Sequence, residues 1–304
     1  MGRVEPEMEW GTMTEPALPA TLADLTEEAR DLLQGAIDLH VHCAPDPFAD
    51  RKMDARELVR DSIAAGLGGI VLKSHEYPTQ PLTWAVSQEM PGIDVYGAIA
   101  LDHGVGGLNV DALEIALRIG TKVVWLPTFD ALWSRERYGR WHSRKDAITL
   151  LDEAGALLPV CHELLDLIAE HGGMLCTGHV SPEETRVVVR AARERGIGTV
   201  VTHATWFGIP LEVQREAAEL GAVIEAVGNP TFKAEDGAEA LAAALRDVRA
   251  LGPQHVALST DLGQAANPIP SVGFGIWIQH FLDAGFSTQE VRQMVQANPA
   301  RVLG

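Results

Sequence analysis

Residues Ile37–His42 (IDLHVH) form a short apolar run that contains two histidines two positions apart. Runs of this length and composition are typical of a buried strand. Alternate side chains of a strand face the same side, so His40 and His42 should point together while Leu39 and Val41 point the opposite way. We therefore expect a strand that presents two imidazoles to one place in the fold.

The pattern of this stretch repeats along the chain. Short apolar runs that end in polar residues alternate with Ala-, Leu- and Glu-rich segments of helical period. The predicted strands are 36–42, 69–73, 94–101, 122–127, 174–178, 199–203, 222–226 and 256–261. Helical segments between them include 55–65, 110–119, 182–194, 211–220 and 239–250. Glycines near the ends of several helical segments favour helix termination there.

Regular alternation of strand and helix predicts an α/β fold with a parallel sheet and helices outside it. A doubly wound open sheet shares this alternation, but eight strands and the positions of polar residues favour a (β/α)8 TIM barrel, for which 304 residues suffice. We expect residues 1–35 to form an N-terminal arm and a short helix, and 36–304 to form a single barrel domain. A long insertion after the fourth strand, at 128–173, should lie over the barrel mouth and contain a hairpin around Gly155.

The composition excludes several classes of protein. With 24 basic and 42 acidic residues the net charge is −18, which disfavours nucleic acid and anionic membranes as partners. The three cysteines lack disulfide or zinc-site spacing, and no export signal or long apolar run is present, so we expect a cytoplasmic protein. The expected partners are a small-molecule substrate and, because barrels often associate, further copies of the chain.

Metal-binding and acid–base side chains follow five of the eight predicted strands. They are His40 and His42, Lys73 with His75 just beyond it, His179, His203, and Asp261. The carboxyl ends of barrel strands carry the active site. One strand histidine alone is most simply a hydrogen-bonded core residue, but a cluster of imidazoles in an apolar interior costs stability unless something binds them. We therefore predict a metal site at this rim.

With these residues in this strand order, the sequence resembles the amidohydrolase superfamily, particularly bare-barrel members without a β-sandwich domain. The resemblance extends from His40 to the terminal segment 298–304. It implies that His40 and His42 bind one divalent metal ion and that His179 and His203 bind a second ion or complete a mononuclear site. It also implies that Asp261 is a ligand and the catalytic proton shuttle. Zinc is the first expectation for the metal, with manganese and iron as alternatives.

One departure from the resemblance concerns the bridge between two ions. Two-metal members usually carry a carboxylated lysine or a glutamate at the end of strand four, but here 122–128 has its only lysine at the start and Trp125 near the end. Lys73 is the candidate substitute, carboxylated to a carbamate that ligates the metal. The alternatives are a charged lysine that grips substrate and a structural ion pair. Without a bridge at Lys73, a site with one ion is favoured.

Further side chains are candidates for binding substrate, each with an ordinary alternative as a loop or surface residue. They are His75, Glu76, His103, Trp125 and His142. His142 lies in the segment 134–145, which is rich in arginine and aromatic residues. This segment is either a lid that grips a carboxylate or phosphate, or a solvated surface or subunit contact.

The function expected first is hydrolysis of a C–N or C–O bond in a small molecule, such as a cyclic amide, amide, lactone or ester. An anionic substrate is one option. Metal-activated water would attack, with Asp261 as base and then acid. One alternative is metal-dependent decarboxylation of a small unsaturated carboxylic acid, which the arginine-rich insertion would suit. The alternative from another class is a catalytically silent barrel that binds a ligand or partner, against which the intact metal-site residues argue.

Overall fold

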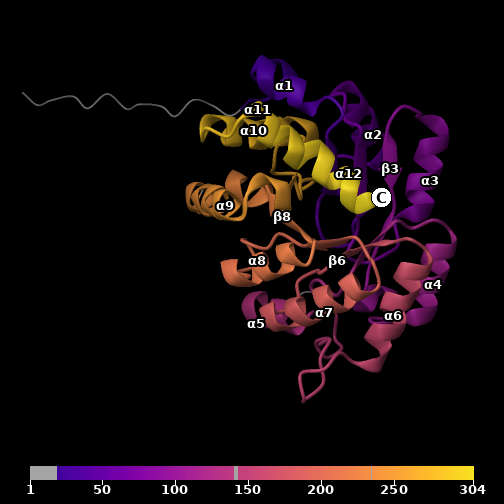
Figure 1. The fold of residues 1–304 in the computed structure, drawn as a ribbon. Coiled ribbons are helices and arrows are strands. Elements are labelled where there is room, and N and C mark those ends of the chain that lie inside the picture. The colour runs from indigo at the N-terminus through magenta and orange to yellow at the C-terminus, as the bar shows by residue number, and fades with distance from the viewer. Residues whose placement is uncertain (1–18, 140–142, 234) are drawn as a thin grey trace, which may run out of the picture.

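The computed structural model describes residues 19–139, 143–233 and 235–304. Of the arm and short helix predicted at 1–35, residues 1–18 lie outside this range. The short helix predicted before Gly35 is α1 (Glu27–Leu33), which begins after Thr26, whose side chain accepts a hydrogen bond from the Ala29 N–H at 3.2 Å. Helix α1 packs against α10 (Pro270–Asp283), as Figure 1 shows.

The strands are parallel to one another and coincide with the predicted runs. They are β1 (Ile37–His42), β2 (Gly69–Lys73), β3 (Asp94–Tyr96), β4 (Ala98–Ala100), β5 (Val123–Trp125), β6 (Met174–Cys176), β7 (Thr199–Val201), β8 (Val223–Val227) and β9 (Val256–Ser259). Their pairing gives one sheet of order β1-β2-β3 and another of order β4-β5-β6-β7-β8-β9. The α/β fold with parallel strands is therefore confirmed. Strands β3 and β4 are two halves of the predicted strand 94–101, interrupted at Gly97.

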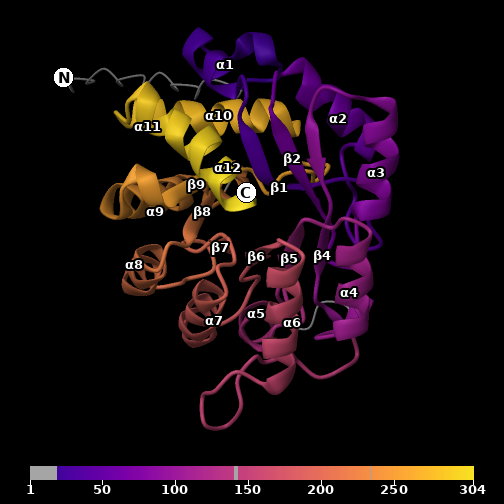
Figure 2. The ribbon, with the colours of Figure 1, turned by 45° about the vertical axis from the view of Figure 1, so that its right-hand side comes forward.

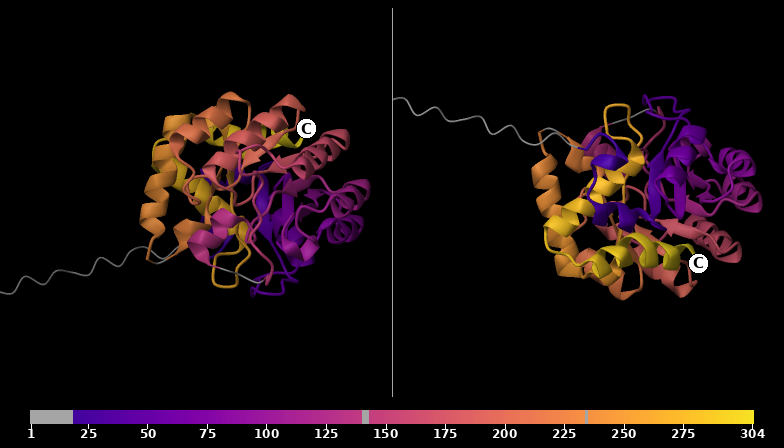
Figure 3. Two further views of the ribbon diagram at one scale, coloured as in Figure 1. Left: turned by 90° about the horizontal axis from the view of Figure 1, so that it is seen from below. Right: turned by 90° about the horizontal axis from the view of Figure 1, so that it is seen from above.

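The last strand returns to the side of the first. The Asp261 N–H donates to the His40 carbonyl at 2.7 Å, and the His42 N–H donates to the Leu262 carbonyl at 2.8 Å. Below these bonds, the buried Asp38 carboxylate accepts hydrogen bonds from both the N–H and the hydroxyl of Thr260, at 3.0 and 2.6 Å. The strands therefore follow one another in chain order, and the end of β9 lies beside β1. The helices lie outside the strands (Figures 2 and 3).

Helices follow the strands in the expected alternation. Besides α1 and α10 they are α2 (Ala55–Ala64), α3 (Gln80–Glu89), α4 (Val110–Arg118), α5 (Leu132–Tyr138), α6 (Pro159–Glu170), α7 (Pro182–Glu194), α8 (Leu211–Glu219), α9 (Gly237–Leu251), α11 (Thr288–Arg292) and α12 (Asn298–Leu303). Helix α7 shows why they form where they do: Ser181 and Glu184 make a reciprocal capping box at its start, and Pro182 occupies the first turn. No helix in the described ranges has the length and apolar character needed to cross a membrane.

Two apolar layers hold the strands. The inner one is made by alternate strand residues, among them Leu39, Val71, Val123, Trp125, Met174, Val223 and Ala257. The other positions, Val41 among them, join the larger cluster that packs against the helices. Leu39 was predicted to face the helices with Val41, and this is wrong because the register of β1 against β2 shifts between Asp38 and Val41. Such a bulge lets Leu39 join the inner layer while His40 and His42 still share a face.

The long connection from β5 to β6 contains regular structure. Helix α5 comes first, and a hairpin-like turn follows, with an antiparallel bridge between Leu151 and Leu157 and a hydrogen bond from the Leu158 N–H to the Leu150 carbonyl at 2.9 Å. The hairpin predicted around Gly155 is thus confirmed. Helix α6 then leads to β6, so the residues inserted beyond the ordinary strand–helix unit end before Pro159.

Candidate metal centre

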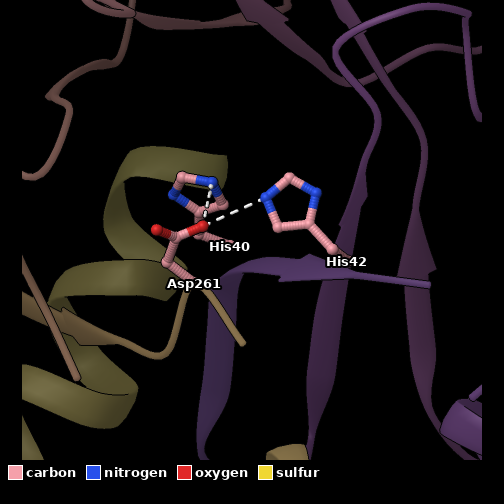
Figure 4. Close-up of side chains that lie close together, drawn as sticks. All are labelled: His40, His42 and Asp261. Carbon is pink, nitrogen blue, oxygen red and sulfur yellow. Dashed lines mark hydrogen bonds and ion pairs between the residues drawn. The ribbon is translucent and has the colours of Figure 1, made fainter. Parts of the chain in front are cut away.

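Three predicted site residues meet at the carboxyl end of β1. The Asp261 Oδ1 atom lies 3.0 Å from His42 Nε2 and 3.2 Å from His40 Nε2, and all three side chains are buried (Figure 4). One ligand atom from each residue lies within 4.8 Å of the others. Two imidazoles and a carboxylate at this separation are a donor set that a divalent metal ion can bridge.

The backbone at the strand ends aims these groups. Asp261 and His203 were predicted as the last residues of strands, but both lie beyond the ends because their backbones turn to positive φ, 53° and 24° respectively. Such angles are uncommon outside glycine, and strained backbone tends to gather at functional sites. The Asp261 turn is held by its N–H bond to His40 and by the Asn229 amide, which donates to Asp261 Oδ2 at 3.1 Å.

The remaining predicted histidines surround this group. Ring centroids lie 5.7 Å apart for His40 and His203, 4.8 Å for His203 and His179, 5.9 Å for His179 and His75, and 5.2 Å for His75 and His42. These side chains come from β1 and from the segments after β2, β6 and β7. The structure therefore brings together all the imidazoles that were assigned to the strand ends.

Several buried ring nitrogens in this cluster have no hydrogen-bond partner among the described residues. They are His42 Nδ1, both nitrogens of His179, and His203 Nδ1. Burial is the largest cause that lowers the pKa of His42 and of His203 to about 3, and it lowers the pKa of His179 well below the ordinary value. The rings are thus neutral at pH 7, the form that coordinates a metal ion, so the residues present fit such a group.

Lys73 lies beside the cluster as predicted. Its Nζ is 3.0 Å from His40 Nε2 and 5.1 Å from the centre of the Trp125 ring. Burial lowers the pKa of this amine, against the opposing charges of Asp261 and Glu225. A lysine with a lowered pKa offers more of the neutral amine that carboxylation requires. The ion pairs found among the described residues do not include Lys73, so a structural ion pair is not supported there.

Glu225, on β8, is a site residue that was not predicted. Its carboxylate lies 3.3 Å from His40 Nδ1 and accepts a hydrogen bond from the His203 N–H at 2.9 Å. Burial acts to raise the pKa of Glu225, but its interactions with His40 and the hydrogen bond from the His203 backbone N–H outweigh burial and lower the pKa. An ionised Glu225 fixes the proton of His40 on Nδ1 and leaves Nε2 free to ligate.

A cavity of about 350 Å³ opens over the cluster. Its polar wall includes His42, Lys73, His75, His179, His203 and Asp261, and its aromatic wall consists of Phe48, Phe129, Tyr138, Trp206 and Phe207. We call this the mouth cavity. Such a mainly apolar space with a few converging polar groups is typical of a site for a small organic molecule.

The weaker candidates take different places. His75 lines the mouth cavity, with Nδ1 2.7 Å from the Thr128 hydroxyl. Trp125 is fully buried in the inner layer behind His40, at 5.4 Å between ring centres, so its expected contact with substrate is not supported. His103 donates to the Asp146 carbonyl at 2.8 Å and lines a neighbouring hollow instead, which shares Glu76 with the mouth cavity. His142 lies outside the described residues.

Two arginines of the insertion, Arg135 and Arg137, are engaged within the protein. Arg135 pairs with Asp130 and donates to the Lys145 carbonyl at 2.6 Å, while the Arg137 guanidinium lies 3.2 Å from the centre of the Trp133 ring. The residue of α5 that reaches the mouth cavity is Tyr138. These contacts give no support to a grip on a substrate carboxylate by Arg135 or Arg137.

Comparison with known families places the sequence. Residues 35–225, more than half of the chain, match the model of a family of unknown function, DUF6282. The chain belongs to this family. The matched range contains His40, His42, His179, His203 and Glu225, whereas Asp261 follows it. A search of curated proteins found no match.

Solved structures are similar over nearly the whole chain. An amidohydrolase from Pseudomonas aeruginosa has a TM-score of 0.64 at 14% identity, covering 91% of this chain and 97% of its own. An organophosphorus hydrolase from Deinococcus radiodurans has a TM-score of 0.59 at 15% identity, covering 91% and 94%. A dipeptidase described as a metallo peptidase has a TM-score of 0.61 at 13% identity, covering 89% and 98%. The resemblance to the amidohydrolase superfamily is thereby confirmed at the level of the fold.

Proposed function

We propose that this protein is a metal-dependent hydrolase on a (β/α)8 barrel, which cleaves a C–N or C–O bond in a small cyclic amide, amide, lactone or ester. The observation that carries the proposal is the buried group of His40, His42 and Asp261, whose ligand atoms lie within 4.8 Å of one another. The descriptions of the similar structures as an amidohydrolase, an organophosphorus hydrolase and a metallo-dipeptidase support the same class.

The residues of the cluster have separate parts in this proposal. His40 Nε2, His42 Nε2 and Asp261 Oδ1 would hold one divalent ion, with zinc as the first candidate, and His179 and His203 would complete that site or hold a second ion. When bound, such an ion lowers the pKa of water toward neutrality and polarises the scissile group. Lys73 as a carbamate would accompany two ions, and as an amine it would accompany one.

Asp261 is the proposed base and acid. Burial acts to raise its pKa, but His40 and His42 outweigh burial and hold the pKa well below the ordinary value. Asp261 is therefore ionised at pH 7 and can accept a proton from the attacking water, then deliver it to the leaving group. Asn229 keeps the carboxylate oriented through its bond to Oδ2, and Glu225 keeps His40 in the ligating tautomer.

The proposal is tested by the metal content and the activity of the same preparation. Purified protein should contain one or two divalent ions per chain, and it should hydrolyse at least one member of a panel of lactones, aryl esters, amides and hydantoins. Turnover should disappear with chelation and return with added zinc or manganese. A folded chain that binds no divalent ion, and whose turnover does not depend on one, contradicts the proposal.

A further inference from the structure

A second cavity, of about 310 Å³, lies between β8 and α9. We call it the β8–α9 cavity. Ala226 and Val227 of β8 line one side, and Ala240, Ala243 and Ala244 of α9 line the other. The three alanines recur at helical spacings of three and four residues, so they share one face of α9. Their small side chains are what leaves the space open.

The β8–α9 cavity touches the metal centre. His203 and Glu225 belong to its wall, and His203, Trp206 and Lys233 line both this cavity and the mouth cavity. Trp206 contacts His203 edge to face, with ring centres 5.3 Å apart, and the Lys233 ammonium lies 4.8 Å from the centre of a Trp206 ring. Trp206 is thus a partition between two spaces that meet beside the imidazoles.

The lining of the β8–α9 cavity is largely apolar where it is buried and charged where it is exposed. The buried part of the wall consists of alanine, valine and proline side chains with His203 and Glu225, and Thr205, Thr231, Ala240 and Ala243 are half-buried. Lys233, Asp236 and Glu239 are exposed. An apolar pocket of about 150 Å³ is enough to hold a benzene ring. The space here therefore suits an aromatic ring or a branched aliphatic group.

We propose that the β8–α9 cavity is a second substrate subsite, which holds an aromatic or branched aliphatic arm while the scissile bond lies by Asp261. This rests on the proposed hydrolase function and adds the substrate class to it, namely amides, esters or lactones with one bulky apolar substituent. Trp206 separates this arm from the rest of the substrate in the mouth cavity. The alanines of α9 set the largest substituent that fits.

The test measures binding of indole, as a bulky apolar probe, to the zinc-loaded full-length protein by calorimetry. Ala243→Phe fills the cavity, and Ala242→Phe places the same side chain on the exposed side of the same helix as a matched control. Wild type and Ala242→Phe should bind one indole with equal affinity, and Ala243→Phe should bind it at least tenfold more weakly. Ala240→Leu, a smaller change, should show the same loss if Ala243→Phe does not fold.

Other outcomes overturn the proposal. Indole binding that is lost in Tyr138→Ala and unchanged in Ala243→Phe places the probe in the mouth cavity, and failure of wild type to bind indole removes the subsite. Zinc titration of the metal-free protein reports on the proposed function separately. Zinc binding without indole binding contradicts only the subsite, whereas indole binding without zinc binding contradicts the hydrolase.

Discussion

Side chains on the inner face of the strands form two layers, which we call the lower and the upper layer. The two layers lie only two residues apart along the chain and have opposite character. In the lower layer, which belongs to the inner apolar cluster, Val71, Val123 and Val223 are fully buried. In the upper layer, two residues further along, β2 presents Lys73 and β8 presents Glu225. Strand β1 adds His40 and His42 to this layer. Apolar side chains in the lower layer stabilise the fold, whereas the upper layer buries polar groups, and several of its ring nitrogens have no partner in the part of the chain that the structure describes. The upper layer therefore lowers the stability of the fold unless it binds something.

The largest effect should come from Asp261→Asn, which removes the proposed base from the upper layer. We expect kcat to fall by about 10²- to 10⁴-fold, the usual contribution of general acid–base catalysis. Folding should persist because the amide is nearly the same shape. Steady-state kinetics together with circular dichroism check this, and a fully active Asp261→Asn protein removes Asp261 from the mechanism.

In the lower layer, Met174→Ala should have the opposite signature. The side chain is 1% exposed and belongs to the inner apolar cluster, so truncation should lower the free energy of unfolding by about 2–5 kcal/mol. Metal content and turnover per folded molecule should stay close to wild type. Urea unfolding and elemental analysis check the pair of results; a loss of metal with unchanged stability would contradict the division into layers.

Glu225→Gln should weaken metal binding by the upper layer, because it keeps the side-chain volume and removes the charge that holds His40 Nδ1. Partners of metal-ligating histidines typically contribute 10- to 100-fold to metal affinity. We expect zinc affinity to fall within that range, measured by competition with a chromophoric chelator. The control is Glu219→Gln, the same substitution at the exposed C-terminal end of α8. This variant should bind zinc as wild type does. Equal affinity in both variants would show that Glu225 does not support the site.

The smallest expected effect is a gradual fall in the stability of the metal-free protein as the pH is lowered. His42 and His203 have a folded-state pKa of about 3, below the ordinary 6.5. The unfolded chain therefore binds protons more readily, so stability is full above 6.5 and is lost as pH falls from 6.5 toward 3. From about pH 7 to about pH 6 the two rings together should cost about 1 kcal/mol. Urea unfolding after chelation should show this fall, and stability that rises on acidification contradicts it.

Much of this arrangement followed from the sequence, because periodicity and strand-end position depend on local chemistry. The run Ile37–His42 and the positions of His179, His203 and Asp261 were enough to predict the strands and the convergence of the site. The bulge that turns Leu39 inward could not be predicted, because it arises from the register between β1 and β2. Trp125 sits behind the site, and no local pattern separates that position from the cavity wall.

Glu225 was missed for a related reason, although a signal existed. It is the single charged residue in the apolar run 222–227, and a buried strand does not keep an acid without a partner. Its partner, His40, is 185 residues away. Such pairing depends on how β9, with β8 beside it, packs against β1, which only the three-dimensional structure provides.

We propose above that His40, His42 and Asp261 share one metal ion. Crystals of protein loaded with zinc, measured on both sides of the zinc absorption edge, test it most directly. We expect an anomalous peak about 2 Å from the Nε2 atoms of His40 and His42 and beside Asp261 Oδ1. Zinc-loaded crystals with no peak at that position, or with the only peak at a distant surface site, would contradict it.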